Sequence, residues 1–474
     1  MAGTSPASMP YFSRATYPSR FPGQPLLEIQ RDPLGTFERM AATGAALVEA
    51  DTGIRPFFLL TDPELVKELL TTPTDAFVKS PILRRTRVIL GDGLLTSEDP
   101  VHRRHRKLVL PAFHHTRLQD YAETMVGLTQ KTTGPWRDGD VFALDSAMMG
   151  LTLDIVARTL FGAHVDLAVV RIGRALDTTM RIFRRRMMNP LADFLLQLPL
   201  PESIRLRRAR ADLDRVVYDI IQSRRAEPLS KRRTRTDLLA LLLDAQDEDT
   251  GEGLTDDEVR DEVMTLLLAG HETTANALTW TAVLLAGHPD LASCLYGEID
   301  TVLGDRPATF DDLRQLPYTR QVFSEALRLY PPAWAVSRQA IRDTVLGGHR
   351  IPEGAILTIS PYVLHHDARL WSRPDVFDPD RFAPEADIKR HKFAFLPFSA
   401  GRRGCIGEQF AWMEGVLVTA TIAQRWHLAR ADDEPIPLHP TVTLRPGRPI
   451  PVVAHRRGRS TEPARIPTAE ESAV

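Results

Sequence analysis

The stretch FSAGRRGCIG, from Phe398 to Gly407, decides how the rest of this 474-residue chain is interpreted. It holds Cys405, one of two cysteines in the sequence, among Gly401, Gly404 and Gly407. Glycines permit a tight loop and let a ligand approach the backbone closely. A cysteine on such a loop is a candidate axial ligand for an iron-bearing cofactor.

The segment EQFAWMEGVLVTATIAQ follows this loop and predicts an amphipathic helix, so that Cys405 lies just before a helix N-terminus. Unsatisfied backbone N–H groups and the helix dipole stabilise a thiolate at that position. The ordinary alternative is a small buried hydrophobe beside a turn. We adopt that alternative for Cys294, which lies in ASCLYGEI on a predicted helix.

The loop matches the spacing F-x-x-G-x-R-x-C-x-G over its full length, and it resembles the haem-thiolate loop of the cytochrome P450 family. The resemblance implies a mainly α fold with a small β-rich region, holding haem b between two helices. It also implies that Cys405 is the axial ligand of the haem iron and that Arg403 contacts a haem propionate. Phe398 would pack beside the sulfur, and Gly407 would complete the cofactor-binding loop.

Upstream of the loop, Glu325 and Arg328 stand three residues apart on a helix predicted from Thr319 to Leu329. That spacing alone predicts an ion pair within the helix. The pair resembles the E-x-x-R motif of the same family. The resemblance implies a buried network of both residues with Arg381, which would support the haem loop and take no part in catalysis.

A long helix is predicted from the capping box Thr255-x-x-Glu258 to Leu285. Its middle holds AGHETT, residues 269–274, in which a glycine costs the helix about 1 kcal/mol relative to alanine. Threonine side chains that bond back to the backbone bend a helix. Such an open turn, with a hydroxyl beside a carboxylate, could hold a small polar ligand and relay protons.

AGHETT resembles the oxygen-binding groove of the family. By that resemblance Thr273 is the alcohol and Glu272 the acid of a proton-delivery pair. Ala269 and Gly270 would lie against the cofactor. The apolar residues expected around the substrate are Leu266, Leu267, Ala269, Trp334 and Val336.

The basic stretch HRRHRKLVLPAF begins at His102, and Arg106 lies four residues later, on the same face of a helix. It resembles the family motif H-x-x-x-R, whose first position is often Trp, and implies that both residues bind a propionate. Arg338 occupies the place of a further propionate-binding arginine. Solvent exposure is the ordinary expectation for the other basic residues, which are Arg103, Arg104 and Lys107.

Smaller elements complete the predicted fold. Residues 1–31 and 457–474 are expected to be flexible tails around one domain, residues 32–456. A β-hairpin is predicted about Thr52-Gly53, and a helix is predicted to start at Asp62, its N-cap. Strands are predicted in AWAVSRQA and TVLGGHRIPEGAILTIS, with a tight turn at Pro352-Glu353-Gly354.

The apolar segment from Met187 to Pro201 lies between the basic runs RIFRRR and RLRRAR. It has two interpretations, a buried core segment with solvated flanks or a mobile lid over a hydrophobic channel. The sequence offers nothing that separates them.

The composition excludes several classes of protein. Net charge is −2, so no nucleic-acid partner is expected. Two cysteines form no disulfide framework, which favours the cytoplasm. The N-terminus lacks the features of a signal peptide, and no window is apolar enough for a transmembrane anchor.

By resemblance, the protein inserts one oxygen atom from dioxygen into a hydrophobic molecule, by hydroxylation or epoxidation. Terpenoids, fatty acids, steroids and macrolide-type polyketides all suit an apolar pocket. Electrons from NAD(P)H would arrive through a separate reductase and a ferredoxin or flavodoxin, because the chain has no G-x-G-x-x-G motif and too few cysteines for a cluster. Arg103, Arg104, Lys107 and Arg402 would dock that acidic carrier.

Two alternatives remain. A haem-thiolate peroxygenase or isomerase typically lacks the acid–alcohol pair that Glu272 and Thr273 provide. A haem-based sensor or binding protein would need an output module, and the sequence shows none.

Overall fold

The computed structural model describes residues 12–458 except 73–74, 163–174, 176–177, 179–197, 199, 229, 231–234, 236, 247–250 and 388–389. The chain forms two compact units, each assembled from three stretches of sequence. Unit 1 comprises Met1–Arg85, Ala333–Val376 and Asp387–Cys405. Unit 2 comprises Thr86–Pro332, Phe377–Ala386 and Ile406–Val474. The prediction that residues 32–456 make one domain stays a prediction.

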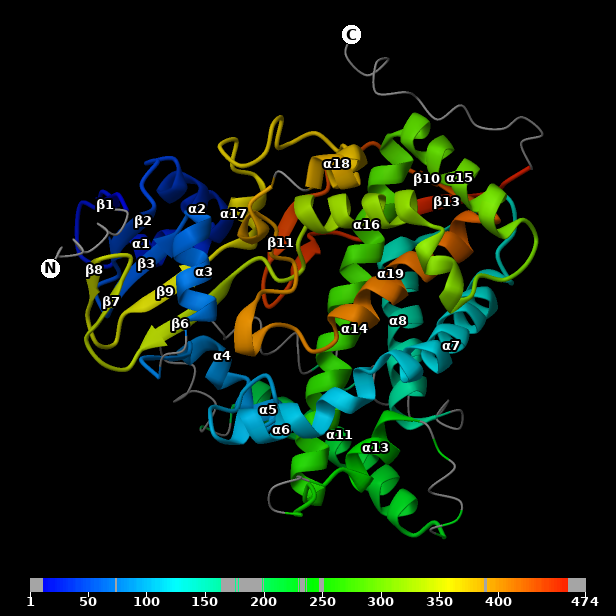
Figure 1. Ribbon diagram of the computed structural model, residues 1–474, viewed down its shortest axis with the longest axis horizontal. Helices are drawn as coiled ribbons and strands as arrows, with labels where there is room; N and C mark the ends of the chain where they lie inside the picture. The colour runs from blue at the N-terminus through cyan, green and yellow to red at the C-terminus, as the bar shows by residue number, and fades with distance from the viewer. Residues whose placement is uncertain are drawn as a thin grey trace, which may run out of the picture. The chain divides into compact units, whose positions relative to one another are not determined.

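Unit 1 is built on a six-stranded sheet with the strand order β1-β2-β3-β9-β6-β4 (Figure 1). Strands β1 and β2 are parallel, as are β3 and β9, and the other pairs are antiparallel. The predicted hairpin is confirmed as β2 and β3, and a further two-stranded sheet joins β7 and β8. The bounds are β1 (Arg14–Thr16), β2 (Leu47–Asp51), β3 (Pro56–Leu60), β4 (Phe77–Lys79), β6 (Val336–Ala340), β7 (Thr344–Leu346), β8 (His349–Ile351) and β9 (Ile356–Ile359).

Short helices accompany this sheet. The predicted N-cap is confirmed, since the Asp62 carboxylate accepts a hydrogen bond from the Glu64 amide at 2.8 Å. The apolar side chains between sheet and helices form the core of unit 1, with Phe58, Leu65 and Leu357 fully buried. The helices are α1 (Gln24–Arg31), α2 (Pro33–Ala41), α3 (Pro63–Thr71), α4 (Pro81–Arg85), α17 (Pro361–His365) and the 3₁₀ turns η4 (Lys392–Ala394) and η5 (Gly401–Arg403).

The prediction of a flexible N-terminal tail is wrong for much of residues 12–31. Residues 1–31 were expected to be a flexible tail, yet they contain β1 and α1. Helix α1 has proline in its first turn and buries Pro25 and Ile29, while β1 pairs with β2. The abundance of Pro, Ser and Gly that suggested a loose tail is outweighed by these tertiary contacts.

Unit 2 is mainly helical. Two small antiparallel sheets accompany its helices, one with the order β10-β13-β5 and one joining β11 and β12. Its strands are β5 (Asp140–Ala143), β10 (Trp426–Arg430), β11 (Leu438–Pro440), β12 (Leu444–Pro446) and β13 (Pro451–Arg456). Its helices are α5 (Arg87–Leu90), α6 (Val101–Val109), η1 (Leu110–Phe113), α7 (His115–Thr133), α8 (Leu144–Phe161), α11 (Pro201–Arg225), α13 (Leu238–Asp244), α14 (Asp256–Gly287), α15 (Pro289–Leu303), η2 (Phe310–Arg314), α16 (Pro317–Leu329), η3 (Pro379–Phe382), α18 (Pro384–Asp387) and α19 (Glu408–Ala423).

Helix α14 is the longest helix in the described part of the chain and the centre of unit 2 (Figure 1). Its 32 residues make it about 48 Å long at 1.5 Å per residue. It begins with the predicted capping box, in which the Thr255 side chain and the Glu258 carboxylate each accept from the other residue's backbone N–H. Helices α8, α16 and α19 pack along it, so most of its side chains are buried.

Helix α19 follows the Cys405 loop as predicted, but it is not amphipathic. Nearly every residue from Phe410 to Ala423 is buried, because α7, α14 and α16 all pack against this helix. At Gly415 a Cβ atom would lie 2.2 Å from the Phe323 ring of α16, so a glycine allows that close approach. A helix with neighbours on several sides is apolar all round.

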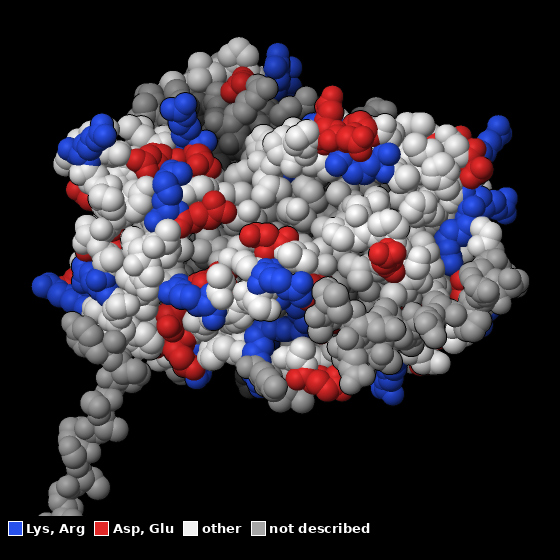
Figure 2. Space-filling model, turned by 90° about the horizontal axis from the view of Figure 1, so that it is seen from above, with Lys and Arg blue, Asp and Glu red and all other residues white. Residues whose placement is uncertain are grey.

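Among the helices that the structure describes, none has the length and apolar character needed to cross a membrane. Basic and acidic side chains are interspersed over the face seen in Figure 2, in keeping with a net charge of −2. Most of the segment from Met187 to Pro201, for which a core segment and a lid were both considered, lies outside the described residues. So does nearly all of the predicted C-terminal tail.

Candidate functional site

The Cys405 loop of unit 1 is a compact turn held by its own backbone. The Cys405 amide donates to the Phe398 carbonyl at 3.0 Å, and the Gly404 amide donates to the Gly401 carbonyl at 3.0 Å. Residues Gly401–Arg403 between them form the 3₁₀ turn η5. The Cys405 side chain is exposed, as a thiolate that binds an external metal centre must be.

Gly401 fixes this loop onto α3. Its φ of +73° lies in the left-handed region, which favours glycine. A Cβ atom at this position would also lie 2.0 Å from the carbonyl oxygen of Leu70, near the end of α3. Both constraints exclude a side chain at Gly401, so the loop rests directly on helix backbone.

Two buried cations lie opposite each other on the sheet of unit 1. Lys79 of β4 and Arg338 of β6 are paired across the antiparallel strands, and they are only 4% and 8% exposed. Arg338 Nη1 also donates to the Ser337 carbonyl at 3.2 Å. Cationic side chains form their strongest hydrogen bonds with anionic acceptors. This arrangement suits the binding of an anionic group. Sequence reasoning identified Arg338 but missed Lys79, because a lysine ending a three-residue strand carries no local signal.

Helix α6 of unit 2 carries His102 and Arg106 as predicted. His102 is buried, with Nδ1 3.5 Å from an oxygen of Asp99, and Arg106 is half-buried. On a neighbouring face of the helix Lys107 is exposed, as is the Arg103 side chain at 74%. The helix therefore separates two buried or half-buried polar groups from a solvated basic face.

Arg104 does not belong to that solvated face, contrary to the prediction for it. Its guanidinium donates to Glu258 of α14 at 2.7 Å and to the Gly253 carbonyl at 2.7 Å. These contacts engage its donors within unit 2, so Arg104 is a poor candidate for docking a carrier.

The AGHETT turn of α14 lies tightly against α8. A Cβ atom at Gly270 would meet Val156 at 3.1 Å, so glycine keeps the two helices close together. The hydroxyl of Thr152 on α8 donates to the carbonyl of His271 at 3.0 Å. On α14 itself, Thr273 Oγ1 donates to the Ala269 carbonyl at 2.5 Å. Ala269 is exposed within a run of buried residues, so the turn is open on that side.

Glu272 is held by side chains of the β11–β12 hairpin. Its buried carboxylate pairs with Arg445, whose Nε donates to Oε1 at 2.5 Å, and it accepts a hydrogen bond from the hydroxyl of Thr443. Asn276, one turn further along α14, donates to the same hydroxyl at 3.1 Å. Arg445 was missed from sequence, since it lies far along the chain from its partner.

The neighbouring His271 is uncharged at neutral pH. Its pKa is lowered to about 4, chiefly by burial; the charge of Glu272 opposes this shift and that of Arg445 adds to it. The ion pair of Glu272 with Arg445 therefore forms beside a neutral imidazole.

The structure brings Glu325, Arg328 and Arg381 together in unit 2. Arg328 donates to both oxygens of Glu325, from Nε and Nη2, at 2.7 Å each, and both side chains are fully buried. Arg381 Nε donates to Oε1 at 3.3 Å, and the Asp378 amide donates to the same oxygen at 3.0 Å. This network ties α16 to η3.

The predicted substrate pocket is only partly supported. Leu267 is fully buried in the core of unit 2, and Leu266 is nearly so, because helical periodicity turns both toward neighbouring helices. That Leu266 and Leu267 line the substrate pocket stays a prediction. In unit 1, Val336 and Trp334 are half-buried, and the Trp334 ring lies 6.0 Å from that of Phe37. An apolar cavity of about 40 Å³ among α8, α14, α15, α19 and β10 involves none of these residues.

Each unit, taken by itself, has side chains whose chemistry suits haem b. Unit 1 supplies an exposed thiol on a glycine loop and the buried cations Lys79 and Arg338 for acidic substituents. Unit 2 supplies His102 and Arg106 on one helix and the open turn at Ala269 on another. Thiolate and cationic ligands of this kind are what an iron porphyrin with two propionates requires.

Comparison with known proteins agrees with this chemistry. The family model described as Cytochrome P450 matches residues 24–452. The chain is 40% identical to Cyclooctatin synthase of Streptomyces melanosporofaciens, over 89% of this chain and 91% of that protein. It is 36% identical to Cyclooctat-9-en-7-ol 5-monooxygenase of the same organism, over 90% and 89% of the two chains. It is 34% identical to Pentalenene oxygenase of Streptomyces avermitilis, over 98% of both.

The fold is similar to that of a solved structure. The crystal structure of the cytochrome P450DA heme domain superposes with a TM-score of 0.83 at 27% identity. The match covers 94% of this chain and 99% of that one.

Proposed function

This chain belongs to the cytochrome P450 family, and from that premise we propose that it oxidises a carbocyclic terpenoid. As a member of the family it is a haem-thiolate monooxygenase, which inserts one atom of dioxygen into a hydrophobic small molecule.

The observation that carries the monooxygenase proposal is the pairing of an alcohol and an acid in the open turn of α14. Thr273 and Glu272 are both present, and each has a defined hydrogen-bond partner. A peroxygenase or an isomerase does not need protons delivered to dioxygen, so it has no use for this pair. We therefore prefer oxygen activation to either alternative.

Haem b would be held by the residues that the resemblance to the family implies, together with Lys79. Cys405 would bind the iron, with Phe398 and Gly407 shaping the loop around it. The propionates would be bound by Arg338, Arg403, Lys79, His102 and Arg106, while Ala269 and Gly270 would face the ring. When bound, the group supplies activation of dioxygen for insertion into a carbon–hydrogen or carbon–carbon double bond.

Thr273 is the residue that we propose to deliver protons to the dioxygen substrate. Its hydroxyl now donates to Ala269, and a rotation about χ1 would free that proton at Oγ1 for a ligand in the turn. The hydroxyl also accepts, so it can take up a second proton after giving one away. A positioned hydroxyl of this kind acts in general acid catalysis.

Glu272 recharges that hydroxyl only if it can reach solvent. Arg445 is partly exposed and pairs with the buried Glu272 carboxylate, so its side chain connects this acid to the surface. We propose that the pair opens during turnover. Arg445 would keep the carboxylate ionised between turnovers, and its departure would let a water bring the next proton.

The substrate proposal derives from the named relatives. Two of them, Cyclooctat-9-en-7-ol 5-monooxygenase and Pentalenene oxygenase, carry carbocyclic alkene or alkenol substrates in their names. The residues predicted to meet the substrate, among them Trp334 and Val336, are apolar and would accept such rings. Fatty acids, steroids and macrolides are the competing classes.

A spectral titration of the purified haem protein tests this proposal. Carbocyclic terpene hydrocarbons and alcohols should displace water from the iron and shift the Soret band to shorter wavelength at micromolar concentration. Fatty acids, steroids and macrolides of similar size serve as the comparison. A response to one of those classes and none to terpenoids would contradict the substrate class while leaving the family unaffected.

Electrons would come from NAD(P)H through a reductase and a small acidic ferredoxin or flavodoxin. The exposed basic residues Arg103 and Lys107 of α6, together with Arg402, support this proposal. A cytoplasmic location agrees with a chain that has two cysteines, too few for a disulfide framework.

A further inference from the structure

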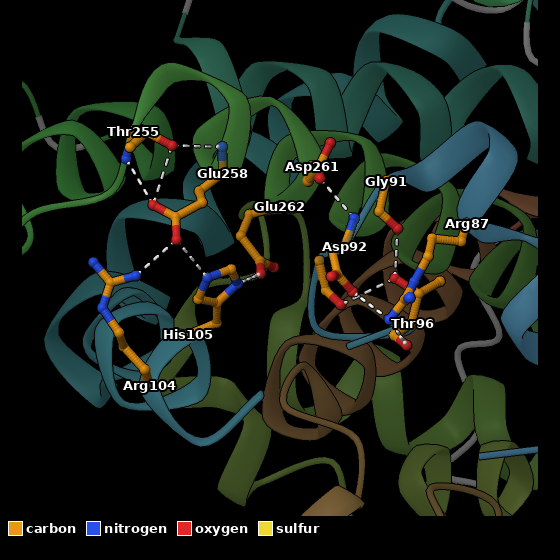
Figure 3. Close-up of polar contacts among 11 residues, drawn as sticks. Arg87, Gly91, Asp92, Thr96, Arg104, His105, Thr255, Glu258, Asp261 and Glu262 are labelled. Atoms are coloured by element: carbon orange, nitrogen blue, oxygen red, sulfur yellow. Dashed lines mark hydrogen bonds and ion pairs between the residues drawn. The ribbon is translucent and has the colours of Figure 1, made fainter. Parts of the chain in front are cut away.

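A buried histidine in unit 2 lies outside the site described so far. His105 of α6 is inserted between two carboxylates in the first turns of α14 (Figure 3). Its Nδ1 is 2.8 Å from Oε1 of Glu262, and its Nε2 is 3.2 Å from Oε1 of Glu258. The side chains of His105 and Glu262 are 1% and 0% exposed, and that of Glu258 is 28% exposed.

The geometry selects one protonation state of the ring. An ionised carboxylate only accepts hydrogen bonds, so an imidazole that faces one with each nitrogen satisfies both only when both nitrogens carry a proton. Burial alone would lower the pKa of His105, but the hydrogen bonds and charges of Glu262 and Glu258 outweigh it and raise this pKa. Burial raises the pKa of Glu262, while the hydrogen bond and charge of His105 oppose that shift.

Other charged groups around the ring are already paired. Arg104 of α6 donates to the same oxygen of Glu258 that faces His105, at 2.7 Å. Asp261 of α14 is engaged by Arg260 at 2.8 Å. Helix α13 also packs against α6 and carries two carboxylates, Asp237, which pairs with Arg224, and Asp244. The turn η1, which packs against the end of α6, has no charged residue.

The same turns of α14 also hold the loop that leads into α6 (Figure 3). The Asp92 amide donates to Asp261 at 2.6 Å. A Cβ atom at Gly91 would lie 1.9 Å from the same carboxylate, and Gly91 has a φ of +68°. Loop and helix are thus fixed to α14 at adjacent positions, the loop through Asp261 and the helix through His105.

We propose that His105 is a positioning residue that fixes α6 on α14 and thereby places His102 and Arg106 for haem binding. This inference rests on the proposed function, which assigns those two residues to the propionates. His102 lies three residues before His105 on the same buried face, and Arg106 follows it directly. A shift of α6 away from α14 would carry both ligands with it.

The sign of the pH dependence follows from the raised pKa. A histidine whose pKa is higher in the folded protein stabilises the fold fully below its unfolded value, about 6.5. That contribution is lost as pH rises through the raised value. We therefore expect α6 to loosen, and haem to be lost faster, as pH rises above the ordinary pKa of histidine.

The test measures haem loss from the intact holoprotein to an excess of a haem-scavenging protein, across pH from mildly acidic to mildly alkaline. The reduced, CO-bound spectrum first establishes thiolate ligation in each variant. His105→Gln should lose haem several-fold faster than wild type at acidic pH, and its rate of haem loss should increase little as the pH is raised. In Glu262→Gln the rate of haem loss should begin to increase at a lower pH than in wild type, because this change removes a carboxylate that raises the pKa of His105. His114→Gln, an exposed histidine just beyond η1, is the control and should match wild type.

The outcomes separate the two levels of the proposal. An absent thiolate spectrum in wild type would overturn the proposed function itself. A normal spectrum with the same pH profile in wild type, His105→Gln and Glu262→Gln would overturn the inference alone. If His105→Gln does not fold, the displaced profile of Glu262→Gln and the NMR titration of the His105 ring in wild type still decide the question. An imidazole that loses its proton below the ordinary histidine range contradicts the inference.

Discussion

At the scale of single residues, the two members of the proposed proton relay face different surroundings. Thr273 bonds back to its own helix, on the side where Ala269 is exposed, and Glu272 is turned toward β12 and paired with Arg445. Consecutive helical residues point about 100° apart, which accounts for this divergence. The acid therefore reaches the alcohol through a change of rotamer or through water.

Replacing Thr273 should separate oxygen consumption from product formation. Thr273→Ala removes the hydroxyl and leaves the ligands of the cofactor intact, so substrate affinity and NAD(P)H consumption should persist. Most electrons should then appear as hydrogen peroxide, with product falling about 10²-fold or more, the usual contribution of general acid catalysis. Parallel assays of NAD(P)H, peroxide and product measure the coupling.

Thr279→Ala, a buried threonine on the same helix that also bonds back to a carbonyl, is the matched control. It should keep the coupling of wild type. Unaltered coupling in Thr273→Ala would contradict the relay and favour a peroxide-driven reaction.

Residue identities could be predicted where the partner lies nearby in sequence. Cys405, Glu325 and Arg328 belong to short motifs whose spacing is visible in the chain. Arg445, Lys79 and His105 could not be found in this way, because each meets its partners only through the fold. Glu272 and Arg445 are 173 positions apart, and His105 and Glu262 are 157 apart.

At the scale of elements, the buried ion pair within α16 should contribute strongly to the free energy of unfolding. In Glu325→Gln the buried guanidinium of Arg328 loses its counter-charge, and breaking a buried pair costs about 3–5 kcal/mol. Chemical denaturation of the haem-free protein should show a loss of that size in the free energy of unfolding. Purified Glu325→Gln should also contain less haem.

Asp212→Asn provides the comparison, since Asp212 and Arg215 of α11 have the same i, i+3 spacing but are more than half exposed. An exposed pair of this kind contributes about 0–1 kcal/mol. Equal losses in the two variants would show that burial of the Glu325 pair has no special role.

Elements were predicted well where capping and periodicity agree, as in α14 and α3. The approach failed for β1 and α1, whose order comes from pairing with β2 and from burial of Pro25 and Ile29. The sequence also predicted a polar face for α19. In the structure the polar residues of that helix from Phe410 onward, Glu414 among them, are buried. The sheet that joins β5 to β13 was not predicted, because strands so distant in sequence carry no sign of their pairing.

At the scale of the whole molecule, acidic and basic residues nearly balance, so the proposed docking of an acidic carrier would depend on a local group of basic residues. The net charge of −2 gives no general attraction for an acidic partner, so in the proposed docking the exposed residues Arg103, Lys107 and Arg402 would supply it. Reduction by an acidic ferredoxin should slow steeply with added salt, since screening acts over about 8 Å at physiological ionic strength. Stopped-flow reduction measures this rate.

Reversing both charges, Arg103→Glu with Lys107→Glu, should slow reduction by about tenfold or more at low salt, the lower range of electrostatic steering. Arg20→Glu with Arg55→Glu, two exposed positions in unit 1, should leave the rate unchanged. A rate that responds to neither salt nor the α6 reversal would place the docking surface elsewhere.

The interleaving of the two units restricts how this enzyme can be recombined with its relatives. Each unit is made of three separate stretches, and the chain passes from one unit to the other between Cys405 and Ile406. A single crossover between two homologous genes therefore brings parental residues of both origins into at least one unit. Exchanging unit 1 intact requires five junctions, and the last falls directly after the predicted iron ligand. Libraries of chimeras should thus retain folding best when their junctions are placed at the boundaries between the units.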